Sequence, residues 1–287
     1  MVKYAFFGTP EFASIVLEKL IGAGMPPAIV VCNPDRPTGR KKIITPPPAK
    51  QSVLEQSEEI RETIEIYQPE KVKEIEDILR NGNFDLFVIA AYGKIIKKEI
   101  LEIPKYGTIG VHPSLLPKHR GSSPIQSSIL MGDKETGVSL FMVDELVDHG
   151  PVVAMETLED CDMDSITYPA LHDALGTLGA EMLLRVLPKV GKEKIALSHQ
   201  DESEATFTTK FVTEDGFIDE ATLADAVSGN SREDALIIDR KIRALNPDPG
   251  VYTMKNGERM KLLEAIVKDG KLVLKKIQMA GKLPQSV

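Results

Sequence analysis

Cysteine is scarce in this sequence, which holds two in 287 residues, Cys32 and Cys161, far apart in the chain. Two distant cysteines provide neither a disulfide framework nor the paired spacing of a metal site, and they favour a reducing compartment. Apolar runs are also short: none approaches the roughly 20 residues that span a bilayer, and the run at residues 1–8 is too soon broken for a signal peptide. We therefore expect a soluble, cytoplasmic protein with no membrane partner.

Positive charge is in deficit, because the formal net charge is −8 at pH 7. This balance argues against a protein that coats nucleic acid non-specifically, since such binding depends on neutralising phosphates. Two segments depart from the average: the lysine-rich stretch 255–282, and a cluster made of Arg36, Arg40, Lys41, Lys42 and Lys50. One such cluster is usually a solvated charged face, but two in an acidic chain leave a polyanionic partner as an open alternative.

A glycine-rich dinucleotide loop is missing from the first strand and helix. Residues 4–7 form an apolar run that ends at Gly8, and Thr9-Pro10-Glu11 then supplies an N-cap, a proline at the first helical position and an acidic first turn. One glycine is not the three-glycine fingerprint that cradles a pyrophosphate. We therefore predict no nicotinamide or flavin cofactor.

The apolar runs that are present alternate with helical patterns, which is typical of a parallel sheet. The run 86–91 is apolar throughout, as expected for a central strand covered by helices on both faces. We predict an α/β fold with a Rossmann-like, mostly parallel sheet, whose strands lie at 4–7, 28–32, 64–67, 86–91, 107–112, 136–142 and 152–157. Further helices are expected near 50–58, 69–79, 97–103, 124–131 and 167–190.

The C-terminal part has a different pattern. Residues 191–206 have the composition of a polar linker, and a helix is expected near 232–245. Three short alternating runs follow, separated by Asn256-Gly257 and Asp269-Gly270, which are strong hairpin signals. We predict a small antiparallel β domain, of the reduced β-barrel (OB-like) kind.

The candidate chemistry centres on the stretch 107–121. His112 lies where an extended run ends and a proline-bounded loop begins, a place that suits acid–base or oxyanion work. A structural role in capping that loop is the alternative. The loop 143–152 carries three carboxylates, any of which could orient the His112 ring. For Asp144 and Glu145 we favour the alternative that they are ordinary turn formers.

The connection 33–51 is far longer than the usual few residues between such elements. Long loops in compact domains are more often functional than idle. Its prolines limit its conformations, and its basic side chains suggest a loop that stays mobile until an anion orders it.

Many motifs of this chain, taken in order and spacing, resemble those of the methionyl-tRNA formyltransferases. They are 7–12, 33–40, 45–48, 91–93, 112–117, 120–121, 124–126, 136–138, 148–150 and 242–247. The resemblance covers nearly the whole chain. It implies a formyltransferase domain at 1–190, a linker at 191–206 and a tRNA-binding β-barrel-like domain at 207–287, in a protein that is usually monomeric.

The resemblance also implies a reaction and a site. The enzyme would transfer the formyl group of 10-formyltetrahydrofolate to the α-amino group of methionyl initiator tRNA for translation initiation, without a metal. Catalytic positions would be His112, Asp148 and Gly110. The resemblance places folate at Ala91, Tyr92, Gly93, Ser114, Leu115, Leu116 and Pro117, and tRNA at Arg36, Arg40, Lys41 and Lys42.

Gly110 departs from the family pattern, which has asparagine two residues before the histidine. Glycine lacks the carboxamide donor, and losing one such donor typically costs on the order of 10²–10³ in turnover. An engineered substitution, a natural variant with another donor, and a protein that binds without efficient turnover are the three explanations. The C-terminal domain also looks shortened, with Asp248 in place of the usual tryptophan.

Two other functions remain open from the sequence. An N-formyltransferase acting on a nucleotide-linked amino sugar would use the same active-site stretch, although a small substrate has no need of the long basic loop. A folate- or tRNA-binding protein with little turnover is the other alternative.

Overall fold

The computed structural model describes residues 2–39 and 41–287, and the chain divides into two compact units. The first unit comprises Met1–Arg120, Thr136–Leu158 and His172–Phe207, and the second comprises Gly121–Glu135, Glu159–Leu171 and Thr208–Val287. Each unit is described by itself below. Within the described ranges, no helix is both long and apolar enough to cross a membrane.

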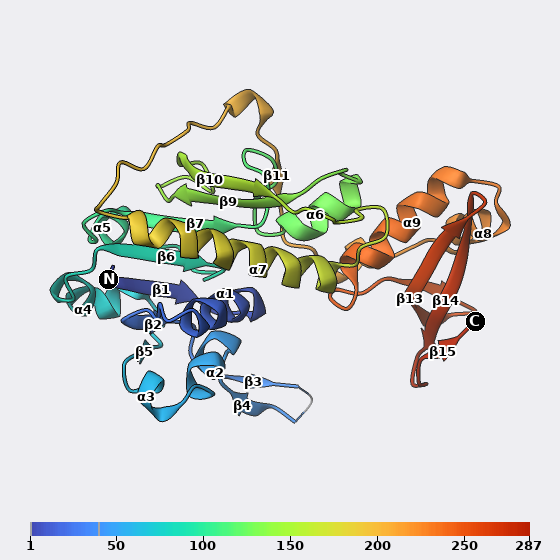
Figure 1. Cartoon of the computed structure of the whole chain (residues 1–287). Helices are drawn as coiled ribbons and strands as arrows, with labels where there is room; N and C mark the ends of the chain where they lie inside the picture. Colours follow the sequence, from blue (N-terminus) through green and yellow to red (C-terminus); the bar gives the residue numbers. More distant parts are fainter. Residues whose placement is uncertain (1, 40) are drawn as a thin grey trace. The chain divides into compact units, whose positions relative to one another are not determined.

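The first unit is built on a seven-stranded sheet in the order β10-β9-β7-β6-β1-β2-β5 (Figure 1). Its strands are β1 (Tyr4–Gly8), β2 (Ile29–Val31), β5 (Glu65–Tyr67), β6 (Leu86–Ala90), β7 (Thr108–His112), β9 (Gly137–Met142) and β10 (Val152–Thr157). Strands β1, β2, β5, β6 and β7 run parallel to one another. Strand β9 pairs antiparallel with β7, and β10 pairs antiparallel with β9. The predicted mostly parallel sheet is therefore confirmed.

Helices cover both faces of this sheet. On one face lie α1 (Glu11–Gly22) and α7 (Tyr168–Val186), where Gly176 and Gly179 of α7 lie close against Ile15 and Val111 (Figure 1). The other face carries the short turn Val72–Ile75, α4 (Glu76–Asn81) and α5 (Lys98–Leu101). The remaining short elements are α2 (Pro48–Leu54), α3 (Glu58–Arg61) and the 3₁₀ turns Leu187–Lys189 and Glu202–Glu204.

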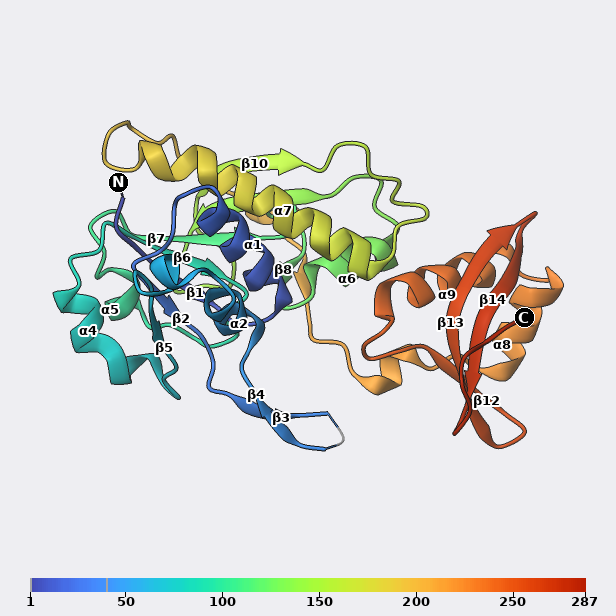
Figure 2. The same ribbon diagram turned by 60° about the horizontal axis from the view of Figure 1, so that its bottom comes forward.

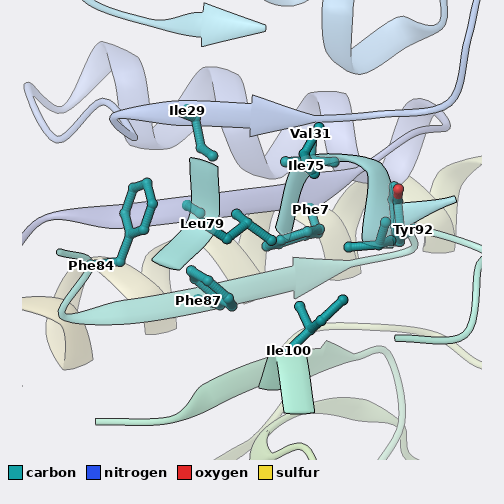
Figure 3. Packing of buried hydrophobic residues seen from close by; sticks show 11 residues of the cluster. Phe7, Ile29, Val31, Ile75, Leu79, Phe84, Phe87, Tyr92 and Ile100 are labelled. Carbon is teal, nitrogen blue, oxygen red and sulfur yellow. The ribbon is translucent and has the colours of Figure 1, made fainter. Parts of the chain in front are cut away.

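The core beneath α4 is built from aromatic and aliphatic side chains of one face of the sheet. Phe7 of β1 packs between Phe87 of β6 and Tyr92, with ring centroids 5.2 and 5.6 Å apart, and Leu79 of α4 covers them (Figure 3). All four side chains are almost fully buried. Burial of such aromatic area is the main favourable term that holds the helix layer on the sheet.

The long connection predicted to be mobile contains a β hairpin. Strands β3 (Arg36–Thr38) and β4 (Ile43–Thr45) pair antiparallel and extend away from α2 (Figure 2). The base of the hairpin is fixed because the Lys50 ammonium hydrogen-bonds both Asp35 carboxylate oxygens, at 2.9 and 2.8 Å, and Gln68 at 2.7 Å. The prediction missed this hairpin because its exposed strands lack an alternating apolar face.

The second unit combines helices with an antiparallel sheet in the linear order β12-β13-β14-β15. Its strands are β12 (Tyr252–Lys255), β13 (Glu258–Lys268), β14 (Lys271–Met279) and β15 (Gln285–Ser286), and its helices are α6 (Pro124–Met131), the turn Thr213–Gly216, α8 (Glu220–Ser228) and α9 (Arg232–Leu245). Within this four-stranded sheet each strand pairs only with its sequence neighbours among the described residues, so the sheet is reduced relative to a closed barrel. The predicted antiparallel β domain is confirmed.

Local signals explain the second unit. Both predicted hairpin turns have positive φ at their two central residues, 52° and 79° at Asn256-Gly257 and 51° and 77° at Asp269-Gly270. Helix α9 begins at Ser231, whose hydroxyl accepts from the Asp234 backbone N–H. Helix α8, with Asp219 as its N-cap, was not predicted.

Segments 121–135 and 159–171 belong with the second unit for a physical reason. Helix α9 packs against α6 and β13. The buried Arg243 guanidinium of α9 pairs with Asp239 at 2.8 Å and donates to the Met163 and Ile166 carbonyls at 3.3 and 2.9 Å. A buried guanidinium requires such partners, so the pair anchors the 159–171 segment to the helix.

Candidate active site

The carboxyl ends of β1 and β6 form the natural ligand edge of the first unit. The chain leaves β1 toward β2 and later returns to β6 on the other side, so the strand order reverses between these two strands. Ligands of open α/β sheets bind at such a point. Just beyond β6, Ala91 and Gly93 have positive φ, 49° and 77°, which turns the backbone sharply away from the sheet.

His112, the last residue of β7, is held between two loops. Its side chain is 7% exposed, its Nε2 lies 2.9 Å from the His119 carbonyl oxygen, and its Nδ1 lies 3.6 Å from Asp148 Oδ2. A carbonyl can only accept, so Nε2 carries a proton. In a neutral ring Nδ1 would then present a lone pair to the Asp148 carboxylate. The pair is therefore arranged to take up a proton on that side.

The three carboxylates of the following loop have different partners. Asp148 faces His112, whereas Asp144 binds His149 Nδ1 at 2.7 Å and also accepts from the Leu146 N–H at 2.9 Å. Glu145 lies 3.5 Å from the Lys98 ammonium. The bond to Leu146 makes Asp144 a turn former, as predicted. Asp148 has a left-handed backbone, with φ 49°, which is uncommon for a residue other than glycine.

Gly110 lies on the same face of β7 as His112, and side chains of neighbouring residues occupy the space where a side chain at position 110 would lie. Gly110 pairs with Phe141 of β9, and a Cβ built on Gly110 would lie 2.5 Å from Phe141 Cε1, 2.7 Å from Cζ and 3.0 Å from Val143 Cγ2. The Phe141 ring also stands edge-on to the His112 ring, with centroids 6.4 Å apart. An aromatic ring therefore fills the space that a side chain at position 110 would enter.

The residues predicted to contact folate divide into open and buried ones. Ala91 and Gly93 are exposed, and Leu115 and Pro117 are half-buried. In contrast, the Ser114 hydroxyl donates to the Lys118 carbonyl at 2.6 Å, and Leu116 packs with Phe141 and Val152. The side chains of Ser114 and Leu116 thus shape the loop from inside, and its outer surface is formed by the half-buried residues.

Tyr92 is also turned inward, so its hydroxyl provides a test. Its ring lies in the core (Figure 3), burial raises its pKa to about 12, and the hydroxyl has no hydrogen-bond partner among the described residues. Tyr92→Phe is expected to leave the free energy of unfolding unchanged or to raise it, because an unsatisfied buried hydroxyl costs about 1–3 kcal/mol. Urea unfolding measures this.

Tyr4→Phe is the matched control, because the equally buried Tyr4 hydroxyl donates to the Met25 carbonyl at 2.6 Å. Losing that bond is expected to lower the free energy of unfolding by about 0.5–1.5 kcal/mol. A Tyr92→Phe protein that unfolds more easily than the Tyr4→Phe protein would contradict the inward placement.

The basic residues predicted to contact tRNA belong to the hairpin, although Arg40 lies outside the described residues. Lys41 and Lys42 are exposed at the tip, next to Ile43 and Ile44, each 62% exposed. Arg36 is already paired, with one Nη2 lying 2.7 Å from both carboxylate oxygens of Glu70. The hairpin therefore presents the two lysines beside an apolar pair.

Three further residues at the site were missed by sequence reasoning. Arg120 is 2% exposed, and its guanidinium donates to Gln200 Oε1 at 3.0 and 2.8 Å and to the Glu202 carboxylate at 2.9 and 2.6 Å. These hydrogen bonds hold the pKa of Glu202 below its ordinary value. Gln200 and Glu202 fall in the segment predicted as a linker, and their partners lie about 80 positions away, so no local pattern signals the contact.

Cys32, at the end of β2, is buried, and burial raises its thiol pKa to about 12. The group therefore stays protonated near neutral pH and does not act as a nucleophile.

The comparisons with known proteins agree with this geometry. A model of the formyl transferase family matches residues 2–187, and a model of the formyl transferase C-terminal domain matches residues 232–283. The chain belongs to the formyl transferase family. The recognised resemblance is thus confirmed, as is the Rossmann-like formyltransferase fold.

A protein of Staphylococcus epidermidis named methionyl-tRNA formyltransferase is 37% identical to this formyl transferase over 273 residues, which is 94% of this chain and 82% of that one. Among solved structures, methionyl-tRNA formyltransferase from Clostridium thermocellum superposes with a TM-score of 0.61 at 16% identity, covering 97% and 99% of the two chains. The sugar 3N-formyl transferase WlaRD, solved in the presence of dTDP and 5-N-formyl-THF, gives 0.62 at 17% identity, covering 99% of each chain. At such identities the structures show a common fold.

Proposed function

We propose that this protein transfers the formyl group of 10-formyltetrahydrofolate to the α-amino group of methionyl-tRNA, in the cytoplasm and as a monomer. The observation that carries the proposal is the His112–Asp148 pair at the end of β7, in a chain whose relative over most of its length is named a methionyl-tRNA formyltransferase. Folate as the donor is supported by the formyl-folate in the WlaRD structure.

The chemistry needs a proton acceptor and a place for developing negative charge. The amine attacks the formyl carbon, the tetrahedral centre collapses, and the bond from the formyl carbon to folate N10 breaks. The attacking amine loses a proton and N10 gains one. His112, with Asp148 facing its Nδ1, takes the first proton and returns it to the leaving nitrogen. In its protonated form His112 also carries a positive charge that favours the developing oxyanion.

The folate site is formed by the loops at the sheet edge. Ala91 and Gly93 leave the end of β6 with an exposed backbone, and Leu115 and Pro117 supply apolar surface beyond β7. A flat pterin ring requires backbone that can be closely approached, which residues without large side chains provide. Glycine at position 110 supplies no side-chain donor, so the oxyanion depends on His112.

The β3–β4 hairpin supports tRNA as the acceptor over a small sugar nucleotide. Its exposed lysines offer two ammonium groups to phosphates, and Ile43 and Ile44 offer apolar contact for unstacked bases. A mononucleotide substrate would not need a projecting hairpin. Strands β13 and β14 of the second unit also carry lysines, among them the exposed Lys261, Lys268 and Lys271.

The hairpin lysines therefore provide a test. Lys41→Ala combined with Lys42→Ala is expected to lower kcat/KM for methionyl-tRNA roughly 10-fold or more. The slope of log affinity against log salt concentration should also fall by about two, because two phosphate contacts are lost. Folate affinity should not change. Lys73→Ala, which removes another exposed lysine of the first unit, is the control. A double variant with full activity on tRNA would contradict the proposed contact between the hairpin and tRNA.

A further inference from the structure

The turn that carries Asp148 is hydrogen-bonded to Gln200, which lies in a segment outside the strands of the sheet. The Gln200 amide nitrogen donates one hydrogen bond to the Asp148 carbonyl at 2.9 Å and another to the Gly150 carbonyl at 2.8 Å. Both N–H groups of one side chain are thus used on the backbone that flanks His149. A left-handed residue such as Asp148 persists where its surroundings fix the backbone.

The orientation of the Gln200 amide is itself fixed. Its Oε1 accepts two hydrogen bonds from the Arg120 guanidinium. A flipped amide would turn its N–H groups toward a group that only donates, and its oxygen toward two carbonyls that only accept. The Arg120 guanidinium therefore fixes the orientation of the Gln200 amide, so that both of its N–H donors point toward the 148–150 turn.

Arg120 is in turn held by the same segment. The Glu202 carboxylate binds the guanidinium through two hydrogen bonds and also lies 3.6 Å from His149 Nε2. The His119 and Arg120 backbone N–H groups donate to Thr206, to its hydroxyl at 2.8 Å and its carbonyl at 2.9 Å. Both loops that contact the His112 ring, at His119 and at Asp148, are therefore fastened to residues 200–206.

We propose that Gln200 is a positioning residue, which keeps Asp148 in register with His112 by holding the 148–150 turn through its amide donors. Residues 200–206 would then be part of the catalytic framework. The inference rests on the proposed function for its kinetic consequence, but its structural part can be measured without turnover.

The variant Gln200→Glu isolates the two donors. Glutamate keeps the shape and can still accept from Arg120, but it presents oxygen in place of N–H to the Asp148 and Gly150 carbonyls. Loss of register on the ångström scale can cost up to about 100-fold in rate. We expect kcat to fall about 10- to 100-fold, with KM for folate within about threefold of the unaltered protein, and hydrogen exchange of the 143–151 segment to rise at least about 10-fold.

Gln56→Glu is the matched control, because the Gln56 amide donates to a backbone carbonyl, that of Ser52, at 2.9 Å and lies away from the site. It should change neither turnover nor exchange in 143–151. Gln200→Met, which removes donors and acceptor alike while keeping the size, replaces Gln200→Glu if that variant does not fold.

The outcomes separate the two proposals. Exchange in 143–151 that does not differ between the Gln200→Glu and Gln56→Glu proteins overturns the positioning role, whatever the turnover. Faster exchange with unchanged kcat overturns it as well, because the turn would be loosened without consequence. If the unaltered protein forms no product although exchange responds as expected, the proposed function fails while the holding of the turn by Gln200 stands.

Discussion

Replacing His112 by glutamine is expected to lower the turnover of formyl transfer by about 10²–10⁴, the usual contribution of a positioned acid–base group. Glutamine can still donate to the His119 carbonyl, as His112 Nε2 does, so the loop should keep its hydrogen bond. It cannot take up a proton facing Asp148. Single-turnover rates with saturating 10-formyltetrahydrofolate would measure the loss, with equilibrium folate binding unchanged.

The chain offers a matched control for this substitution. His172 also faces a carboxylate, with its Nδ1 2.9 Å from Asp173, but it lies on α7 and packs edge-on against Phe12. His172→Gln should keep turnover within about twofold of the unaltered protein. Equal losses in the two variants would show that the His112 effect is structural and would remove its catalytic assignment.

The carboxylates of the 143–150 loop make the same prediction sharper. Asp148→Asn keeps the side chain's shape but removes the charge that faces His112, so we expect a loss of about 10² or more. Asp144 serves the turn and His149, and Asp144→Asn should cost less than about 10-fold. A larger loss for Asp144→Asn than for Asp148→Asn would show that Asp144, and not Asp148, assists His112.

Introducing asparagine at position 110 by itself is not expected to raise the turnover of formyl transfer. The Phe141 ring occupies the space in which the new side chain would lie, and overpacking of a dense core costs about 1–3 kcal/mol. Gly110→Asn should therefore lower the free energy of unfolding without raising turnover. Thermal or urea unfolding, with turnover measured on the same samples, tests both parts.

Making room for the side chain should reverse the result. Phe141→Val keeps a residue suited to a strand but removes the Cε1 and Cζ atoms that block position 110. In the double variant we expect a favourable coupling of about 1–3 kcal/mol. A carboxamide that reaches the formyl oxygen should also raise turnover on the order of 10²–10³ above the Gly110 protein. A single Gly110→Asn variant that is stable and faster would show that Phe141 is no obstacle.

The sheet and the place of His112 could be predicted because their signals are local. The buried runs of β1 and β6 are apolar along their length, and Asn256-Gly257 has the sequence that a tight hairpin requires. The place of His112 follows from the end of its strand. That Asp148 would face it rested on the resemblance, because three carboxylates share the loop.

What could not be predicted depends on contacts between distant segments. That the Phe141 ring fills the space beside Gly110 appears only once the register of β7 and β9 is known. The burial of Arg120 depends on Gln200 and Glu202, which belong to a polar stretch without periodicity. The β3–β4 hairpin is exposed and has no apolar face to reveal its strands.

The most direct measurement is formyl transfer by the unaltered protein, with 10-formyltetrahydrofolate as donor and methionyl-tRNA and a nucleotide-linked amino sugar offered as competing acceptors. We expect formylmethionyl-tRNA to accumulate in proportion to enzyme, to fall to background with His112→Gln, and to exceed any formylated sugar. Formylation of the sugar in preference to the tRNA, or folate binding with no formylated product on either acceptor, would contradict the proposed function.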